Sequence, residues 1–179
     1  MTQRAVIYGS SLYDLAKEEN LAEVIWEEMN AVRQIMRENP DYMSLLSNAS
    51  LSKQERIGLL QEALGEQVQK YLLNFLKLLC ERDLLGEFGG CCEEYRKRYY
   101  QDHNMVEAII TSAVALTEEQ LQALQKKLQA STGKTVVPVQ KVGAGLMGGI
   151  RVEMEGKMLD GSVRERLQGL SRKLNETII

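Results

Sequence analysis

Histidine, proline and cysteine are scarce in this chain of 179 residues, which has one histidine, two prolines and three cysteines. Cys80, Cys91 and Cys92 are an odd number, two of them are adjacent, and their spacing fits no metal-binding pattern. We therefore expect three small, buried apolar groups and no disulfide framework or cysteine metal site. The single histidine, His103, has Asp102 as its sequence neighbour. Adjacency alone makes no catalytic relay, so we expect a solvated linker residue.

The chain also has no long apolar run and no strong excess of one charge. No stretch approaches the roughly 18 apolar residues that a membrane span needs, and the N-terminal sequence lacks the basic start and continuous apolar centre of a signal peptide. We expect a cytoplasmic protein that meets a membrane only through a partner. Residues 1–104 have a net charge of −5 (12 basic, 17 acidic) and residues 105–179 of +2 (10 basic, 8 acidic). Without a basic stripe carrying interleaved aromatic residues, no nucleic acid is an expected partner.

What is present is apolar periodicity, and it changes near residues 101–104. Apolar residues make up 44% of the chain, which is enough for a packed core. Before residue 101 their spacing is that of amphipathic helices almost throughout. The predicted helical segments have apolar faces over residues 6–16 and 21–36 and then cover 40–46, 52–64, 68–85 and, overlapping the last, 84–100.

Capping residues support these helix boundaries. Asn39 followed by Pro40 predicts an N-cap with proline in the first turn. Ser52 with Glu55 predicts a capping box, and Gly65 predicts the end of that helix. The sixth segment contains three glycines, each costing about 1 kcal/mol relative to alanine inside a helix. We therefore predict that this segment is the weakest or most bent helix.

Two helical segments carry residues that invite more than one interpretation. The segment over residues 68–85 is apolar around much of its circumference, which predicts a central place in a bundle or contact with a second partner. Trp26, beside Ile25, is most simply a core residue, and a binding role is the alternative.

Beyond residue 104 the pattern predicts strands and one helix. Thr117 with Gln120 forms a second capping box, which opens a helix that runs to Gly133. Pro138 cannot donate to a strand ladder and so places its strand at a sheet edge or bulge. The turn between the last two strands is expected at Glu155 and Gly156. The predicted strands cover residues 105–114, 135–142, 150–155 and 157–159, and a last helix covers about 162–174.

The fold class predicted from these elements is α+β. An N-terminal six-helix bundle over residues 1–104 is followed by a small mixed β-α-β-β-β-α domain over residues 105–179.

Gly143, Gly145 and Gly148 spell the GxGxxG pattern of dinucleotide-binding loops. That loop must open a helix whose N-terminus holds the pyrophosphate. Here apolar and charged residues alternate over residues 150–155, which predicts a half-buried strand. A kinase-type glycine loop would need a long C-terminal lobe, for which the remaining residues are too few. We favour a glycine-bent turn over a nucleotide site, and a nucleotide-binding enzyme that uses the Gly143–Gly149 loop stays the unfavoured alternative.

Several sequence stretches, in this order, resemble the delta subunit of bacterial F-type ATP synthases, the counterpart of the mitochondrial oligomycin-sensitivity-conferring protein. The most specific are LMGGIRV at residues 146–152 and LDGSVRERL at 159–167. Supporting matches are Tyr8 with residues 12–17, NFLKLL at residues 74–79 and TSAVAL at 111–116. The motif positions carried over from the family are Leu146, Gly148, Gly149, Asp160, Gly161, Ser162, Val163 and Arg164.

Part of this motif has a simpler interpretation. Asp160 and Ser162 are good capping types and Gly161 allows a tight turn, so the stretch predicts a strand-to-helix cap. The alternative is a polar surface at which Arg164 and Arg166 also meet an acidic partner helix.

The resemblance implies a mechanical function with no active site of its own and no cofactor. The helical bundle would bind the N-terminal helix of an alpha subunit of the catalytic hexamer, and the C-terminal domain would join the b subunits of the peripheral stalk. Such a clamp, on the cytoplasmic face of the cell membrane, would stop the hexamer from turning with the rotor of a proton-translocating ATP synthase. A helical adaptor of an unrelated complex is the alternative function.

Helix-in-groove binding needs an exposed apolar trough, which we expect between the first and fifth helical segments. Tyr8, Ser11 and Leu78 are carried over from the family, whereas the other positions follow from helical spacing. The full set of expected partner-binding residues is Tyr8, Ser11, Leu12, Leu15, Phe75, Leu78, Leu79 and Arg82.

Overall fold

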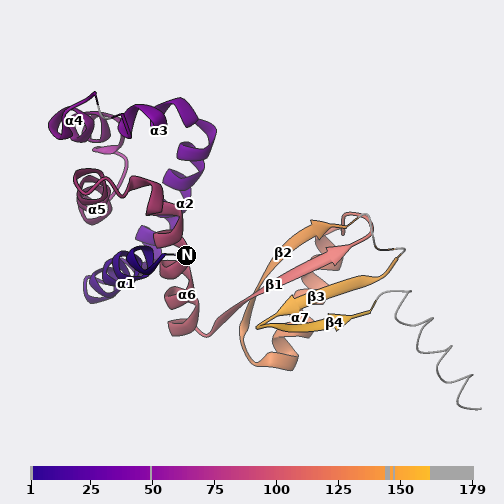
Figure 1. The fold of residues 1–179 in the computed structure, drawn as a ribbon. Helices are drawn as coiled ribbons and strands as arrows, with labels where there is room; N and C mark the ends of the chain where they lie inside the picture. The colour runs from indigo at the N-terminus through magenta and orange to yellow at the C-terminus, as the bar shows by residue number, and fades with distance from the viewer. Residues whose placement is uncertain (1, 49, 144–145, 147, 162–179) are drawn as a thin grey trace, which may run out of the picture. The chain divides into compact units, whose positions relative to one another are not determined.

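The computed structural model of the chain describes residues 2–48, 50–143, 146 and 148–161. The chain divides into two compact units, residues 1–99 and 100–179. Helices occupy the first unit, and the described residues of the second form a mixed sheet and the helix α7, so the fold class is α+β, as predicted (Figure 1). The predicted helix over residues 162–174 lies outside the described residues. No helix of the described part is long and apolar enough to cross a bilayer.

The helices that precede the sheet follow the predicted order. They are α1 (Gln3–Glu18), α2 (Ala22–Glu38), α3 (Pro40–Leu46), α4 (Lys53–Leu64), α5 (Lys70–Glu81), the 3-10 turn η1 (Leu85–Glu87) and α6 (Phe88–Asp102). Their core is aliphatic and aromatic, and its fully buried side chains include Ile25, Met29, Leu60, Leu72, Leu76, Leu79 and Tyr95. The capping box of Ser52 and Glu55 is present, as predicted.

Helices α1 and α6 approach each other closely at Gly9. A Cβ atom placed on Gly9 would lie 2.6 Å from the backbone oxygen of Cys91. One turn later the rings of Tyr13 and Tyr95 meet edge to face, with centroids 5.1 Å apart. The Tyr95 ring also stacks on Trp26, which is half-buried, so Trp26 packs against α6.

The cysteines are buried, as predicted, and each has a free thiol. Burial, which disfavours the charged thiolate, raises the pKa of the Cys80 thiol, that of Cys91 to about 11 and that of Cys92 to about 12. All three thiols are therefore protonated, weakly reactive packing groups near neutral pH.

Three details of the helical unit differ from the sequence-based predictions. Helix α5 ends at Glu81, four residues before the predicted end, because Asp83 takes a left-handed conformation with φ of 56°. The predicted sixth helix is divided between η1 and α6, so Gly86 precedes α6 and its other glycines lie in the first turn. Asn39 is the N-cap of α3, but its side chain donates to the Ile35 carbonyl oxygen of α2 and caps no N–H of α3.

We expect Ser52→Ala to lower the free energy of unfolding by about 1 kcal/mol, because the Glu55 N–H loses its acceptor at the start of α4. Ser52→Thr keeps that oxygen and should retain most of the stability. Urea denaturation followed by circular dichroism measures both variants. Equal losses for alanine and threonine would show that the cap does not stabilise the unit.

The second unit is a four-stranded sheet with α7 on one face (Figure 1). Its elements are β1 (Met105–Ser112), α7 (Glu118–Thr132), β2 (Thr135–Val142), β3 (Ile150–Met154) and β4 (Lys157–Asp160). The strand order is β2-β1-β3-β4. Strand β1 pairs with β2 in parallel and with β3 antiparallel, and β3 pairs with β4 antiparallel. Alternate residues of β1, namely Val106, Ala108 and Ile110, join Leu128 of α7 in the core.

The turns, the helix ends and the edge strand of this unit lie where the sequence predicts them. Strand β2, which contains Pro138, lies at a sheet edge, as predicted. The capping box of Thr117 and Gln120 opens α7, and Gly133 ends it with φ of 67°. Glu155 and Gly156 have φ values of 51° and 72°, as a two-residue turn of type I′ requires.

Candidate functional site

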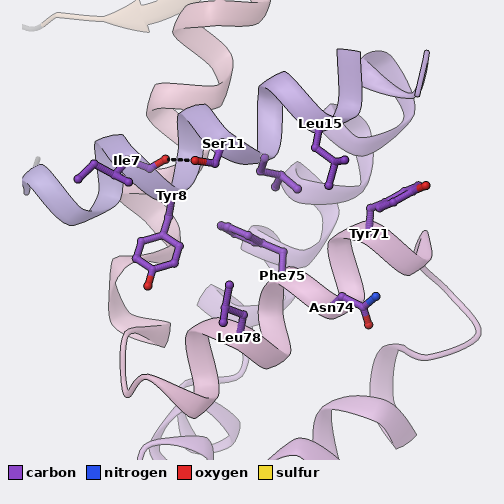
Figure 2. Close-up of a pocket in the computed structure, with 9 residues that line it drawn as sticks. Ile7, Tyr8, Ser11, Leu15, Tyr71, Asn74, Phe75 and Leu78 are labelled. Atoms are coloured by element: carbon purple, nitrogen blue, oxygen red, sulfur yellow. Dashed lines mark hydrogen bonds between the residues drawn. The ribbon is translucent and has the colours of Figure 1, made fainter. Parts of the chain in front are cut away.

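An open apolar groove of about 560 Å³ lies between α1 and α5. Figure 2 shows the side chains that reach it from the two helices, with the Phe75 ring between them. The lining residues are Ile7, Tyr8, Ser11, Leu12, Leu15, Tyr71, Asn74, Phe75 and Leu78.

The groove is apolar because each of the two helices has apolar residues outside the face that packs into the core. On α1, the core face includes Leu12 and Ala16, while Ile7 and Leu15 stay exposed. On α5, Leu72, Leu76 and Leu79 are buried, while the Leu78 side chain is 38% exposed. These exposed apolar side chains line the same groove. Exposed apolar surface of this kind is typical of a site for a protein partner.

Contacts inside the groove hold its walls in place. The rings of Tyr8 and Phe75 make a T-shaped, edge-to-face contact across the two helices, with centroids 6.5 Å apart and an interplanar angle of 61°. The Ser11 hydroxyl donates to the Ile7 carbonyl oxygen at 2.9 Å, as the dashed line in Figure 2 marks. The serine hydroxyl is therefore satisfied inside α1.

Tyr71 lies at the edge of the groove. A hydrogen bond with the Glu19 carboxylate, which follows α1, raises the pKa of the Tyr71 phenol, and desolvation adds to the effect. The carboxylate stabilises the neutral phenol and disfavours the phenolate. This contact connects the end of α1 to the start of α5.

We expect Glu19→Gln to lower the pKa of Tyr71 toward the ordinary value of about 10. Because the folded pKa lies above the unfolded one, the contact stabilises the protein fully below the unfolded pKa. That contribution disappears as pH rises through the folded pKa. Carbon-13 NMR titration of labelled tyrosines, with Tyr71→Phe for assignment, measures the change. An unchanged pKa in Glu19→Gln would exclude the hydrogen bond.

Six of the eight residues expected to bind a partner line this groove, namely Tyr8, Ser11, Leu12, Leu15, Phe75 and Leu78. Leu79 is fully buried, and neither it nor the exposed Arg82 is among the lining residues. Ile7, Tyr71 and Asn74 also line the groove and are not among the residues expected from the sequence. Tyr71, Asn74 and Leu78 are spaced i, i+3, i+7 and so lie on one face of α5. Because Leu78 was an expected binding residue, this spacing could have identified Tyr71 and Asn74.

A second, smaller hollow of about 300 Å³ lies among α2, α3, α4 and the residues just after α4. Ile35 and Met36 of α2 face it together with Tyr42 of α3. The Tyr42 hydroxyl donates to the Leu59 carbonyl oxygen at 3.2 Å. This hollow provides a matched control surface for tests of the larger groove.

The glycine-rich segment of the second unit is followed by a strand, as predicted. Gly148 and Gly149 both have positive φ, 152° and 86°, and β3 follows directly. No helix starts at the described residues of this segment, and Gly149 is followed by a strand and not by the helix N-terminus on which a dinucleotide loop depends.

The described residues of the LDGSVRERL motif complete the sheet. The Arg151 guanidinium donates to the Asp160 carboxylate at 3.0 Å across β3 and β4. The Gly161 N–H donates to the Ile150 carbonyl oxygen at 2.9 Å. The half-buried Leu146 precedes β3, and its N–H donates to the Gly143 carbonyl oxygen. Ser162, Val163 and Arg164 lie outside the described residues.

An open apolar groove on a helical unit, followed by a small α+β unit, is typical of proteins that bind a partner and have a structural role. The family model of the ATP synthase delta (OSCP) subunit matches residues 5–174. The chain belongs to this family, and it is a structural subunit of the ATP synthase, in the stator.

Individual relatives are similar to this chain over nearly its whole length. ATP synthase subunit delta of Synechococcus elongatus is 30% identical over 168 residues, covering 93% of each chain. The subunit delta of Clostridioides difficile is 27% identical over 172 residues, covering 96% of this chain and 95% of the relative. A chain of the Toxoplasma gondii mitochondrial ATP synthase hexamer has the same fold, with a TM-score of 0.74 at 17% identity over 97% of this chain and 98% of that one.

Proposed function

We propose that the groove between α1 and α5 binds the N-terminal amphipathic helix of an alpha subunit, and so attaches this stator subunit to the catalytic hexamer. The observation that carries the proposal is that the exposed apolar side chains of Ile7 and Leu15 on α1 and of Leu78 on α5 line a single open groove. An amphipathic helix buries its apolar face in such a groove through residues spaced i, i+3, i+4 and i+7.

The length of the groove fits such a ligand. From Ile7 to Leu15 the lining residues of α1 extend over two turns, or about 12 Å at 1.5 Å per residue. A bound helix of two to three turns would cover Ile7, Leu15 and Leu78, the most exposed aliphatic side chains of the groove. The larger volume of this groove, about 560 Å³ against about 300 Å³, favours it over the hollow beside α2.

Isothermal titration calorimetry with a synthetic peptide tests this proposal. The probe is the first roughly 25 residues of the alpha subunit from the same organism, long enough for several helical turns. We expect saturable one-to-one binding. A peptide of the same composition in scrambled order, which loses the apolar stripe, should give no saturable heat. Binding of neither peptide by the folded protein would overturn the proposal.

We further propose that the second unit joins the b subunits of the peripheral stalk, on the cytoplasmic face of the cell membrane. Its edge strand β4 supports this assignment, since the side chains of Met158 and Leu159 are 58% and 59% exposed. Proteins normally protect sheet edges, so an exposed apolar edge is typical of a surface that a partner covers. In this proposal each unit binds a different partner. The groove of the helical unit binds the catalytic hexamer, and the sheet of the second unit binds the peripheral stalk.

We expect Leu159→Asp to weaken binding of the soluble part of the b subunits about tenfold or more, because a charge would enter a covered apolar contact. Leu78→Asp, which changes the groove of the other unit, should leave this binding unchanged. Sedimentation or calorimetric titration measures both variants. Unchanged stalk binding by Leu159→Asp would exclude β4 from the interface.

A further inference from the structure

Two polar side chains, Ser11 and Asn74, line the otherwise apolar and aromatic groove. They differ in one respect. The Ser11 hydroxyl is satisfied within α1, because it donates to the Ile7 carbonyl oxygen at 2.9 Å. The Asn74 side chain is exposed, and among the residues that the structure describes its carboxamide has no hydrogen-bond partner.

Asn74 lies where a bound helix would cover it. It follows Tyr71 by one turn on α5, precedes Leu78 by one turn and is adjacent to Phe75, and all four residues line the groove (Figure 2). Its carboxamide has two N–H donors and a carbonyl acceptor. Covering these groups with apolar surface would remove their water and leave them unsatisfied, which opposes binding.

Where the middle of a bound helix covers Asn74, a polar side chain of the partner avoids this penalty. The backbone N–H and carbonyl groups in the middle of a bound helix already pair with each other. Asn74 therefore favours a helix that has one polar residue within its apolar face. A single polar group in an apolar contact also fixes register, because sliding the helix by one turn would leave both polar groups unpaired.

We propose that Asn74 is a specificity-determining residue, which hydrogen-bonds a polar side chain within the apolar face of the bound helix and sets the register of that helix. This inference rests on the proposed function of the groove. It adds a requirement for the chemistry of the ligand that a purely apolar groove would not impose.

Replacing each polar lining residue in turn tests the inference against the alpha-subunit peptide. Asn74→Leu enlarges the apolar surface of the groove, yet we expect it to weaken peptide binding about fivefold or more, because the polar group of the peptide would become buried without a partner. Ser11→Ala removes a hydroxyl that is already satisfied in α1, and binding should stay within about twofold. Thermal unfolding should be nearly unchanged in both variants, since both positions are exposed.

A double-mutant cycle identifies the matching group. Each polar residue in the apolar face of the peptide is replaced by alanine and titrated against wild type and Asn74→Ala. One replacement should weaken binding to the wild type and have little further effect on Asn74→Ala. Binding to Asn74→Leu that equals or exceeds the wild-type affinity, or coupling to no peptide residue, would overturn this inference alone. Failure of the wild type to bind the peptide would overturn the proposed function as well.

Discussion

Replacing Leu78 with aspartate is expected to weaken binding of the alpha-subunit peptide about 100-fold or more, or about 2.8 kcal/mol. Leu78 lines the groove from α5 and is 38% exposed, so the free protein tolerates a polar group there. In the complex the aspartate would be covered by the apolar face of the peptide without a cationic partner, and burial of an unpaired charge is costly. Calorimetric titration measures the loss.

Ile35→Asp is the matched control for this prediction. Ile35 is 39% exposed and faces the smaller hollow beside α2, so the two substitutions introduce the same charge at nearly equal exposure. Peptide affinity of Ile35→Asp should stay within about twofold of wild type, because a distant exposed charge contributes little. If Ile35→Asp abolished binding and Leu78→Asp did not, the peptide site would be the hollow and not the groove.

Gly9→Ala is expected to lower the free energy of unfolding of the helical unit by about 1 to 3 kcal/mol, despite the better helix propensity of alanine. The added Cβ would lie 2.6 Å from the backbone oxygen of Cys91 and 3.1 Å from the Cβ atom of Glu94. Backbone atoms in α6 cannot rotate away as a flexible side chain can. Helices α1 and α6 must therefore separate, which weakens the contact between Tyr13 and Tyr95 one turn later.

Gly58→Ala provides the opposite expectation within the same unit. Gly58 lies inside α4, and a Cβ atom there would meet nothing within 4 Å. The substitution should stabilise the protein by up to about 1 kcal/mol through helix propensity alone. Urea denaturation compares the two variants. Stabilisation by Gly9→Ala would contradict the close approach of α1 and α6.

Local sequence signals account for much of this fold. The two capping boxes begin at Ser52 and Thr117 where side-chain spacing predicts them, because a cap depends on residues within one turn. The Glu155-Gly156 turn and the edge position of the Pro138 strand follow from backbone requirements of single residues. The end of α5 could not be predicted, because Asp83 takes a positive φ that the sequence ERDLL at residues 81–85 does not indicate.

Helical periodicity predicts which residues of the site are apolar and share a helix face, but not which of them stay exposed. Spacing places Leu78 and Leu79 on adjacent sectors of a broad apolar face, and only the packing of the other helices makes Leu79 buried and Leu78 exposed. Similarly, nothing in the sequence around Gly9 indicates that a side chain there would clash. The close approach follows from the position of Cys91, over 80 residues later in the chain. Contacts between distant helices therefore decide which apolar residues remain for a partner.

Site-specific photo-crosslinking in the assembled ATP synthase tests the central claim most directly. A benzoylphenylalanine replaces Leu78 in the groove or, as the control, Ile35 in the smaller hollow, and mass spectrometry identifies the cross-linked peptides. From position 78 we expect cross-links to the N-terminal segment of an alpha subunit, and from position 35 none to that segment. Cross-links to that segment from position 35 alone, or to another subunit from position 78, would contradict the assignment of the groove between α1 and α5.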